Sequence, residues 1–192
     1  MSNHTVAGST SVQSTDVSTV KITQLGGTAI AVLRVAMGFV FMWPFLDKLF
    51  GLGYSTASDK SWINGGSPTK GFLSNVAVGP FESFFHSIAG VWWANILFMG
   101  ALFAIGLALI LGVALRLAAA GGTLLLVMMW AASWPMAQFT SAGEATRSTN
   151  PFLDDHLVYA LVLIVLAVVA AGNYFGLGRW WAGVTGGKSW LR

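Results

Sequence analysis

The sequence predicts an all-α integral membrane protein, folded as a four-helix bundle. Three observations support this class: four long apolar spans, very few charged residues, and small residues repeated at helical spacing. The spans are Leu25 to Leu46, Trp92 to Gly112, Leu117 to Met136 and Leu157 to Phe175. Each has about twenty residues, the length an α-helix needs to cross ~30 Å of hydrocarbon.

Composition excludes several other classes. The chain is 55% hydrophobic and 9% charged, whereas about a quarter of the residues in soluble domains are charged. The basic residues are scattered singly, which argues against binding to nucleic acid. The chain has no cysteine, so dithiol exchange, cysteine nucleophiles and thiolate-held iron–sulfur clusters are excluded in this chain.

The 192 residues divide into three predicted parts. Residues 1–24 are rich in Ser and Thr and read as a disordered cytoplasmic tail. Residues 25–181 form the transmembrane domain, and residues 182–192 a short C-terminal tail. Within the domain, residues 51–90 make a loop too long for a simple connection. Its short apolar faces predict interfacial helices that form a lid over the outer end of the bundle.

Charge distribution predicts the orientation of this multi-pass protein in the cell membrane. Four crossings place both termini on one side. Arg116 lies in the tight turn between the second and third spans, and short positive loops are disfavoured on the translocated side. We therefore expect both termini in the cytoplasm and the loop of residues 51–90 outside.

Small residues recur at every fourth position of the second span: Gly100, Ala104, Ala108 and Gly112. Such a face lets another helix approach closely. Packing within the monomer and contact with another subunit both remain open.

Two basic residues occupy the first span. Arg34 and Lys48 are fourteen positions apart, which puts them on one helix face ~21 Å apart. Asp47 is a candidate counter-ion for Lys48. Arg34 lies deep in the span, where a charge is expensive and marks either a functional site or an internal helix contact.

Polar groups cluster where the third span ends and the fourth begins. Trp130, Trp134 and Gln138 follow one another at helical spacing, so we expect them on one face. Asp154, Asp155 and His156 precede the fourth span, and Tyr159 follows. One of the two aspartates is expected to cap the helix. His156 beside a carboxylate is also a proton-handling group of the kind that quinone chemistry requires.

The histidines favour neither a metal nor a haem site. They are His4 in the tail, His86 in the loop and His156. No span carries the paired imidazoles that a haem bundle would show. We therefore expect no metal or haem of the chain's own.

Several segments together resemble the DoxX/DoxD family of membrane proteins. They are the first span with Arg34, the run FMWPFLDKLF, the loop segment WINGGSPTKGFL, the Gly-containing second span before Arg116, and the closing GLGRWW. The loop is most similar to that of the DoxD-type small subunit of thiosulfate:quinone oxidoreductase. The resemblance extends from Leu25 to Trp181. It implies a four-helix membrane subunit that works with a protein partner in electron transfer to the quinone pool.

Two functional hypotheses follow, with a transporter as a weaker third. In the first, the chain is a subunit of a membrane oxidoreductase and holds a menaquinone or ubiquinone headgroup. The candidate cofactor-binding residues are Arg34, Lys48, Trp130, Trp134, Asp154, Asp155, His156 and Tyr159. In the second, it is a non-catalytic accessory subunit of a respiratory cytochrome supercomplex, bound through its small-residue face. Surrounding lipid is expected in either case.

Overall fold

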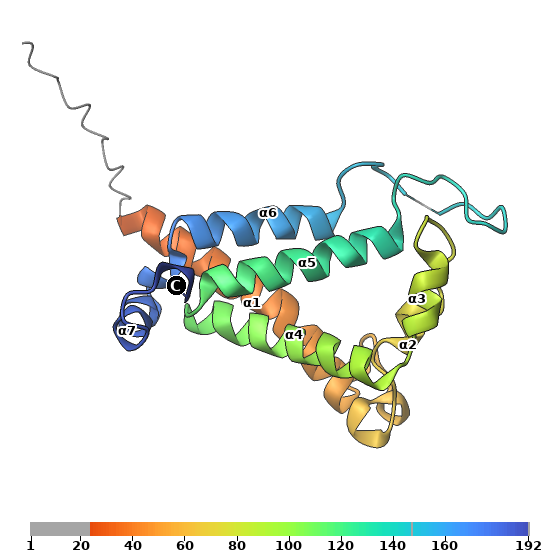
Figure 1. Cartoon of the computed structure of the whole chain (residues 1–192), viewed down its shortest axis with the longest axis horizontal. Coiled ribbons are helices and arrows are strands. Elements are labelled where there is room, and N and C mark those ends of the chain that lie inside the picture. Colours follow the sequence, from red (N-terminus) through yellow and green to blue (C-terminus); the bar gives the residue numbers. More distant parts are fainter. Residues whose placement is uncertain (1–23, 147, 192) are drawn as a thin grey trace, which may run out of the picture.

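The protein is built from helices that mostly run along one direction (Figure 1). The computed structural model describes residues 24–146 and 148–191, so the predicted N-terminal tail lies almost wholly outside the described residues. The long helices are α1 (Gln24–Phe50), α4 (Trp92–Leu111), α5 (Leu115–Ser133) and α6 (Asp155–Val168). The short ones are η1 (Ser58–Lys60), η2 (Trp62–Asn64), α2 (Lys70–Leu73), α3 (Glu82–Ile88), η3 (Ala171–Asn173), α7 (Gly178–Val184) and η4 (Ser189–Leu191). Within the described ranges, strand pairing is limited to one bridge between Phe139 and Ala145.

Three of the described helices, α1, α4 and α5, are long and apolar enough to cross a membrane. This confirms the first three predicted spans as long apolar helices and indicates a membrane protein. The fourth, α6, is apolar but has 14 residues. It ends at Val168, whereas the sequence predicted a span that continues to Phe175.

The early end of α6 has a packing cause. Ala170 takes a left-handed conformation with φ 50°, which turns the chain out of the helix. Gly172 then lies against the backbone of Gly112, where an added Cβ would meet the carbonyl oxygen at 2.1 Å. The turn is fixed further by a hydrogen bond of 2.9 Å from the Leu177 amide to the Leu111 carbonyl. The C-terminal segment therefore folds back against the end of α4.

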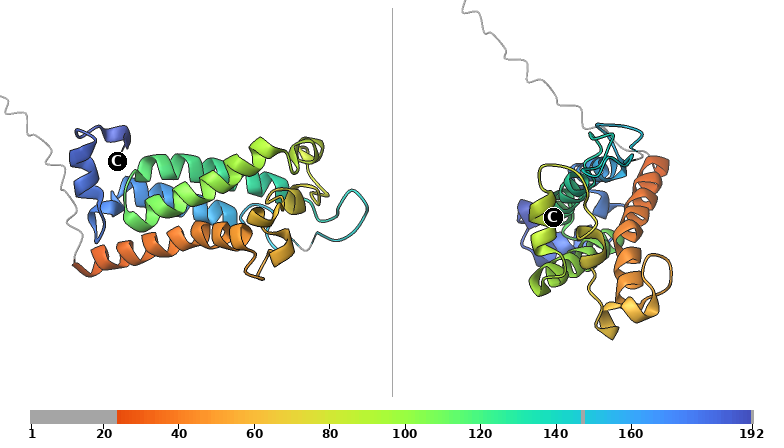
Figure 2. Two further views of the ribbon diagram at one scale, coloured as in Figure 1. Left: turned by 90° about the horizontal axis from the view of Figure 1, so that it is seen from below. Right: turned by 90° about the vertical axis from the view of Figure 1, so that its right-hand side faces the viewer.

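Helix α1 packs along α4, and α5 packs along α6, as Figure 2 also shows from two other sides. Their shared core contains Phe41, Leu109, Leu163 and Leu166, each at most 2% exposed. Gly38 and Gly106 bring α1 and α4 together: a Cβ on Gly106 would lie 3.0 Å from the Met42 amide nitrogen. Close approach of this kind provides van der Waals contact between helices in a membrane.

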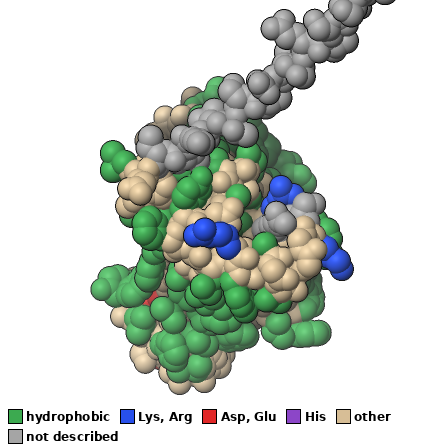
Figure 3. Space-filling model, turned by 90° about the vertical axis from the view of Figure 1, so that its left-hand side faces the viewer, with side chains coloured by type: hydrophobic (Ala, Val, Ile, Leu, Met, Phe, Trp, Pro, Cys, Tyr) green, Lys and Arg blue, Asp and Glu red, His purple; other side chains and the backbone are tan. Residues whose placement is uncertain are grey.

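The two ends of the helices differ. The terminal end, as we call it, carries the start of α1 together with α7 (Figure 1). Seen end-on, this face displays basic side chains (Figure 3). Arg116 of α5, Arg179 of α7 and Lys188, which lies between α7 and η4, are exposed. At the opposite end, the loop end, lie α2, α3 and the connection between α5 and α6.

Candidate functional site at the loop end

Asp154 holds His156 at the start of α6. One Asp154 carboxylate oxygen accepts the Leu157 amide at 3.1 Å, so Asp154 is the N-cap of the helix. The other oxygen lies 2.7 Å from His156 Nδ1. The chain enters this cap through a turn in which the Asn150 side-chain oxygen accepts the amides of Phe152 and Leu153.

This pairing leaves one imidazole nitrogen available. The side chains of His156 and Asp154 are 18% and 19% exposed. Because Nδ1 faces the carboxylate, His156 is oriented with Nε2 directed away from it, and Nε2 has no hydrogen-bond partner among the described residues. A histidine held by a carboxylate in this way can take up or release a proton at its second nitrogen.

Asp155 is mostly exposed and lies 3.5 Å from His156 Nδ1. Together the three residues place potential metal-ligand atoms within 4.8 Å of one another. The presence of both carboxylates is explained without a metal ion. Asp154 caps α6, and Asp155 lies in its first turn, where the helix dipole stabilises a negative charge. His86 is not in this group: its Nε2 lies 2.7 Å from the Val76 carbonyl oxygen.

Trp130 and Trp134 lie together at the end of α5. Their ring centroids are 5.6 Å apart with an interplanar angle of 54°. Trp130 Nε1 is buried and has no hydrogen-bond partner in the described structure, and a buried indole N–H usually has one. An acceptor from a bound molecule would satisfy it.

The predicted alignment of Gln138 with these indoles is wrong, because α5 ends at Ser133. Trp134 has φ 38° and turns the chain. Its ring packs on Gly79, where a Cβ would lie 2.9 Å from the Trp134 side chain. Gln138 is in the loop beyond, and its carbonyl accepts the Thr146 amide.

Tyr159 follows His156 by three positions on α6. It is half-buried and packs against the main apolar core. Antiparallel packing of α5 and α6 places Trp130, His156 and Tyr159 at the same end of the molecule.

Lys48 also lies at the loop end, but it lines a cavity to which Trp130 and His156 do not contribute. It is half-buried, and its Nζ is 3.4 Å from Ser55 Oγ. Within the described residues no ion pair of 4 Å or less joins Lys48 to Asp47, although the charge of Asp47 does act on Lys48. The Asp47 carboxylate instead accepts the amides of Tyr54 and Ser55 and the Ser55 hydroxyl, at 3.2, 3.0 and 2.7 Å. Asp47 thus fixes the turn that follows α1.

Arg34 is at the terminal end, far from the other candidates. It is fully buried, and its guanidinium donates to the carbonyls of Leu109, Ile110 and Phe175. The first two belong to the last turn of α4, where carbonyls lack the usual i→i+4 partner; the Leu109 carbonyl also accepts the amide of the C-cap residue Gly112, at 3.2 Å. Arg34 therefore caps α4 and ties the C-terminal segment to it.

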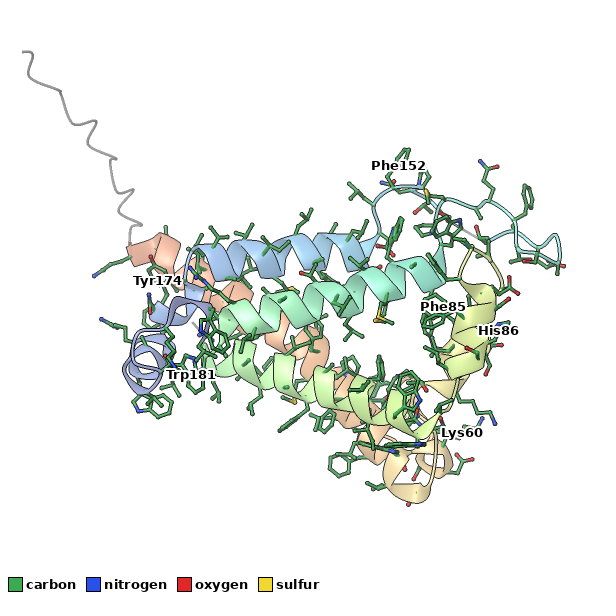
Figure 4. All side chains as sticks on the ribbon, in the orientation of Figure 1. Lys60, Phe85, His86, Phe152, Tyr174 and Trp181 are labelled. Atoms are coloured by element: carbon green, nitrogen blue, oxygen red, sulfur yellow. The ribbon has the colours of Figure 1, made fainter. Side chains whose placement is uncertain are left out.

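A cavity of about 1080 Å³ lies between α4 and α5 and extends under α2 and α3. Figure 1 shows α4 and α5 diverging toward this end. Lys48 lines the cavity, whereas the other seven predicted site residues are not among its lining residues. Figure 4 shows Phe85, which also lines it, on the side of α3 that faces the long helices, and His86 on the other side.

Asn95 was not predicted as a site residue; it does not line the cavity itself but holds Ser67 and Thr69, which do. Asn95 is 8% exposed, and its side-chain oxygen accepts the Thr69 hydroxyl at 2.7 Å and the Thr69 amide at 3.1 Å. Its amide group also donates to Ser67 at 3.1 Å. The loop segment is thereby fixed to the first turn of α4. An asparagine inside an apolar span was the available signal, since such a residue requires a partner.

Comparisons with protein families, with curated proteins and with solved structures find no match to this chain. The resemblance to the DoxX/DoxD family therefore stays a prediction.

Proposed function

We propose that this chain is a DoxX/DoxD-like membrane subunit that works with a protein partner in electron transfer to or from the quinone pool. The observation that carries the proposal is the Asp154–His156 pair, 2.7 Å apart, on the same end of α5 and α6 as the unpartnered Trp130 N–H. The three apolar helices long enough to span a membrane support a location where quinones dissolve.

For topology we propose four crossings of the cell membrane with both termini in the cytoplasm, α6 being the fourth. The start of α1 and α7 lie at the same end (Figure 1), which requires an even number of crossings. Exposed Arg116, Arg179 and Lys188 at this end agree with the positive-inside rule. The short helices α2 and α3 would then lie at the outer membrane surface.

The residues fit a quinone headgroup by their chemistry. A bound quinone would supply two carbonyl oxygens, which take up protons when electrons reduce the ring. Trp130 would donate its free N–H to one of these oxygens, and the Trp134 ring would provide an apolar surface beside it. His156 would exchange the proton at Nε2 while Asp154 stabilises the imidazolium. Electrons would come from a partner subunit.

Substitution of His156 tests this role. His156→Gln keeps a polar side chain but cannot exchange protons, so we expect a fall of about 10²-fold or more in quinone-linked turnover. Turnover is measured in native membranes with the amount of folded protein held equal. His86→Gln is the matched control, because His86 lies on α3 outside the proposed site. Full activity of His156→Gln would remove the site.

A second candidate function is an accessory subunit of a respiratory cytochrome supercomplex. The supporting observation is that Gly100 and Ala104 of α4 are exposed, and a Cβ on Gly100 would meet nothing within 4 Å. Of the two readings left open by the sequence, contact with another subunit is the one that exposed Gly100 and Ala104 favour. The face could receive a helix of another subunit.

Bulky residues on this face test the accessory role. Gly100→Leu and Ala104→Leu should release a bound partner without unfolding the chain, as read from co-purification in mild detergent. Ala36→Leu, at an exposed position on α1, is the control. Retention of every partner by both α4 variants would contradict a contact through this face.

A further inference from the structure

We propose that the cavity between α4 and α5 binds an anionic membrane lipid, with the headgroup at the loop end and the acyl chain between the two helices. This site is separate from the Asp154–His156 pair. It rests on the membrane location in the proposed function and not on the quinone role.

The membrane side of the cavity is apolar and opens between the helices. Leu97 of α4 and Leu124 of α5 both line it, and they are 64% and 63% exposed. Met128 and Ala101 extend the same lining. In a membrane these exposed leucines would face lipid, so a hydrocarbon chain could enter sideways without crossing polar surface. The volume of about 1080 Å³ is just above the range of roughly 300–1,000 Å³ for small-molecule sites.

The loop side of the cavity is cationic. Lys48, Lys60 and Lys70 line it against one acidic residue, Asp59. Figure 4 places Lys60 at this end, near the start of α4. The ammonium groups of Lys60 and Lys70 make no ion pair within the described ranges, and both side chains are exposed.

The uncharged polar side chains Asn64, Ser67 and Thr69 of this wall already have hydrogen-bond partners within the protein. Ser67 and Thr69 are held by Asn95, and the Asn64 side chain donates to the Ser58 carbonyl at 2.8 Å. The unmatched groups that remain are mostly lysines, so the headgroup that complements them carries negative charge, such as a phosphate. A neutral quinone would leave them without a counter-ion. Free phosphate would leave the apolar part of the cavity unfilled.

Titration with short-chain lipids tests the site. The purified full chain in a non-ionic detergent is titrated with dioctanoyl phosphatidylglycerol and dioctanoyl phosphatidylcholine, and bound lipid is counted by native mass spectrometry. Inorganic phosphate alone and a short-chain quinone are the further probes. We expect the anionic lipid to bind about tenfold more tightly than the zwitterionic lipid, with weaker binding of the other two.

Two variants locate the binding. Lys60→Gln with Lys70→Gln should reduce the preference for the anionic lipid to near equality; Lys188→Gln is the charge control. Gly121→Leu should abolish binding of both lipids, because Gly121 lines the cavity and a Cβ there meets nothing within 4 Å. Leucine also favours a helix more than glycine does, so this variant should fold. The neighbouring Ala120→Leu, exposed and outside the lining, is its control.

Equal affinity for the two lipids in the wild-type chain would overturn the proposal. So would unchanged lipid binding in Gly121→Leu, tight binding of phosphate alone, or a quinone that binds as tightly as the anionic lipid and is lost in Gly121→Leu. The last outcome would show that the cavity binds quinone and not an anionic lipid. Because the titration measures lipid binding only, its result is independent of whether turnover depends on His156.

Discussion

A buried guanidinium beside the last turn of a helix satisfies carbonyls that lack the usual i→i+4 partner. Arg34 does this for α4, and the helix dipole favours a cation at that place. The third carbonyl, from Phe175, joins the C-terminal segment to the same group. One residue thus holds three segments of the chain together at the terminal end.

Replacement of Arg34 should destabilise the fold. We expect Arg34→Met to lower the free energy of unfolding by about 3 kcal/mol, because buried carbonyls lose a charged donor. Arg34→Lys keeps the charge but not the planar fork, so it should recover part of the loss. Thermal unfolding in detergent measures both, with the exposed Arg179→Gln as control. If Arg34→Met unfolded at the same midpoint temperature as the wild-type chain, the cap would contribute little to stability.

The sequence could indicate that Arg34 faces the interior, but not what it binds. Its partners include backbone carbonyls 75 and 141 positions away. Every residue has a backbone carbonyl, so residue type does not indicate which ones Arg34 binds. Asp154 was different. Its role as a cap depends on residues within three positions, so local pattern was enough to predict that one of the two aspartates caps the helix.

At the scale of helices, contact between α1 and α4 depends on Gly38 and Gly106. Small residues at every fourth position of α4 predicted that another helix approaches the face of Gly100 and Ala104. Both residues are exposed. Both faces carry small residues, and the sequence alone does not say which one meets α1. The ends of α5 and α6 were also hard to predict, because Trp134 and Ala170 turn the chain in left-handed conformations that tertiary packing imposes.

Two glycines of α4 should therefore respond differently to the same change. Gly106→Leu should destabilise the fold by about 1–3 kcal/mol or more, since the added side chain would push α1 away. Gly100→Leu should unfold at or above the wild-type temperature, because glycine is the poorer helix former. Thermal unfolding of the two variants in one detergent compares them directly. An equal loss in both would refute the described α1–α4 contact.

For the whole molecule, the first three spans follow from length and composition, and the structure bears them out as long apolar helices. The cavity between α4 and α5 was beyond prediction, because it is lined by residues from the loop, α2, α3 and three long helices, α1 contributing Lys48. Its lysines are spread over the sequence and show no local pattern. Only the fold brings them to one place.

The proposed topology can be mapped with single cysteines, since the chain has none of its own. Ser141→Cys lies in the loop between α5 and α6, and Lys188→Cys lies beyond α7. A maleimide that cannot cross the membrane should label Ser141→Cys on intact cells and Lys188→Cys only after permeabilisation. Labelling of both positions from one side would contradict the four crossings.

Purification of the tagged protein from its native membrane in mild detergent tests the central claim most directly. Co-purifying proteins are identified by mass spectrometry, and quinone is extracted and quantified against the protein. We expect about one quinone per chain together with a redox partner subunit, and loss of the quinone in a Trp130→Phe, His156→Gln double variant. Recovery with cytochrome subunits and without quinone would contradict it and favour the accessory role.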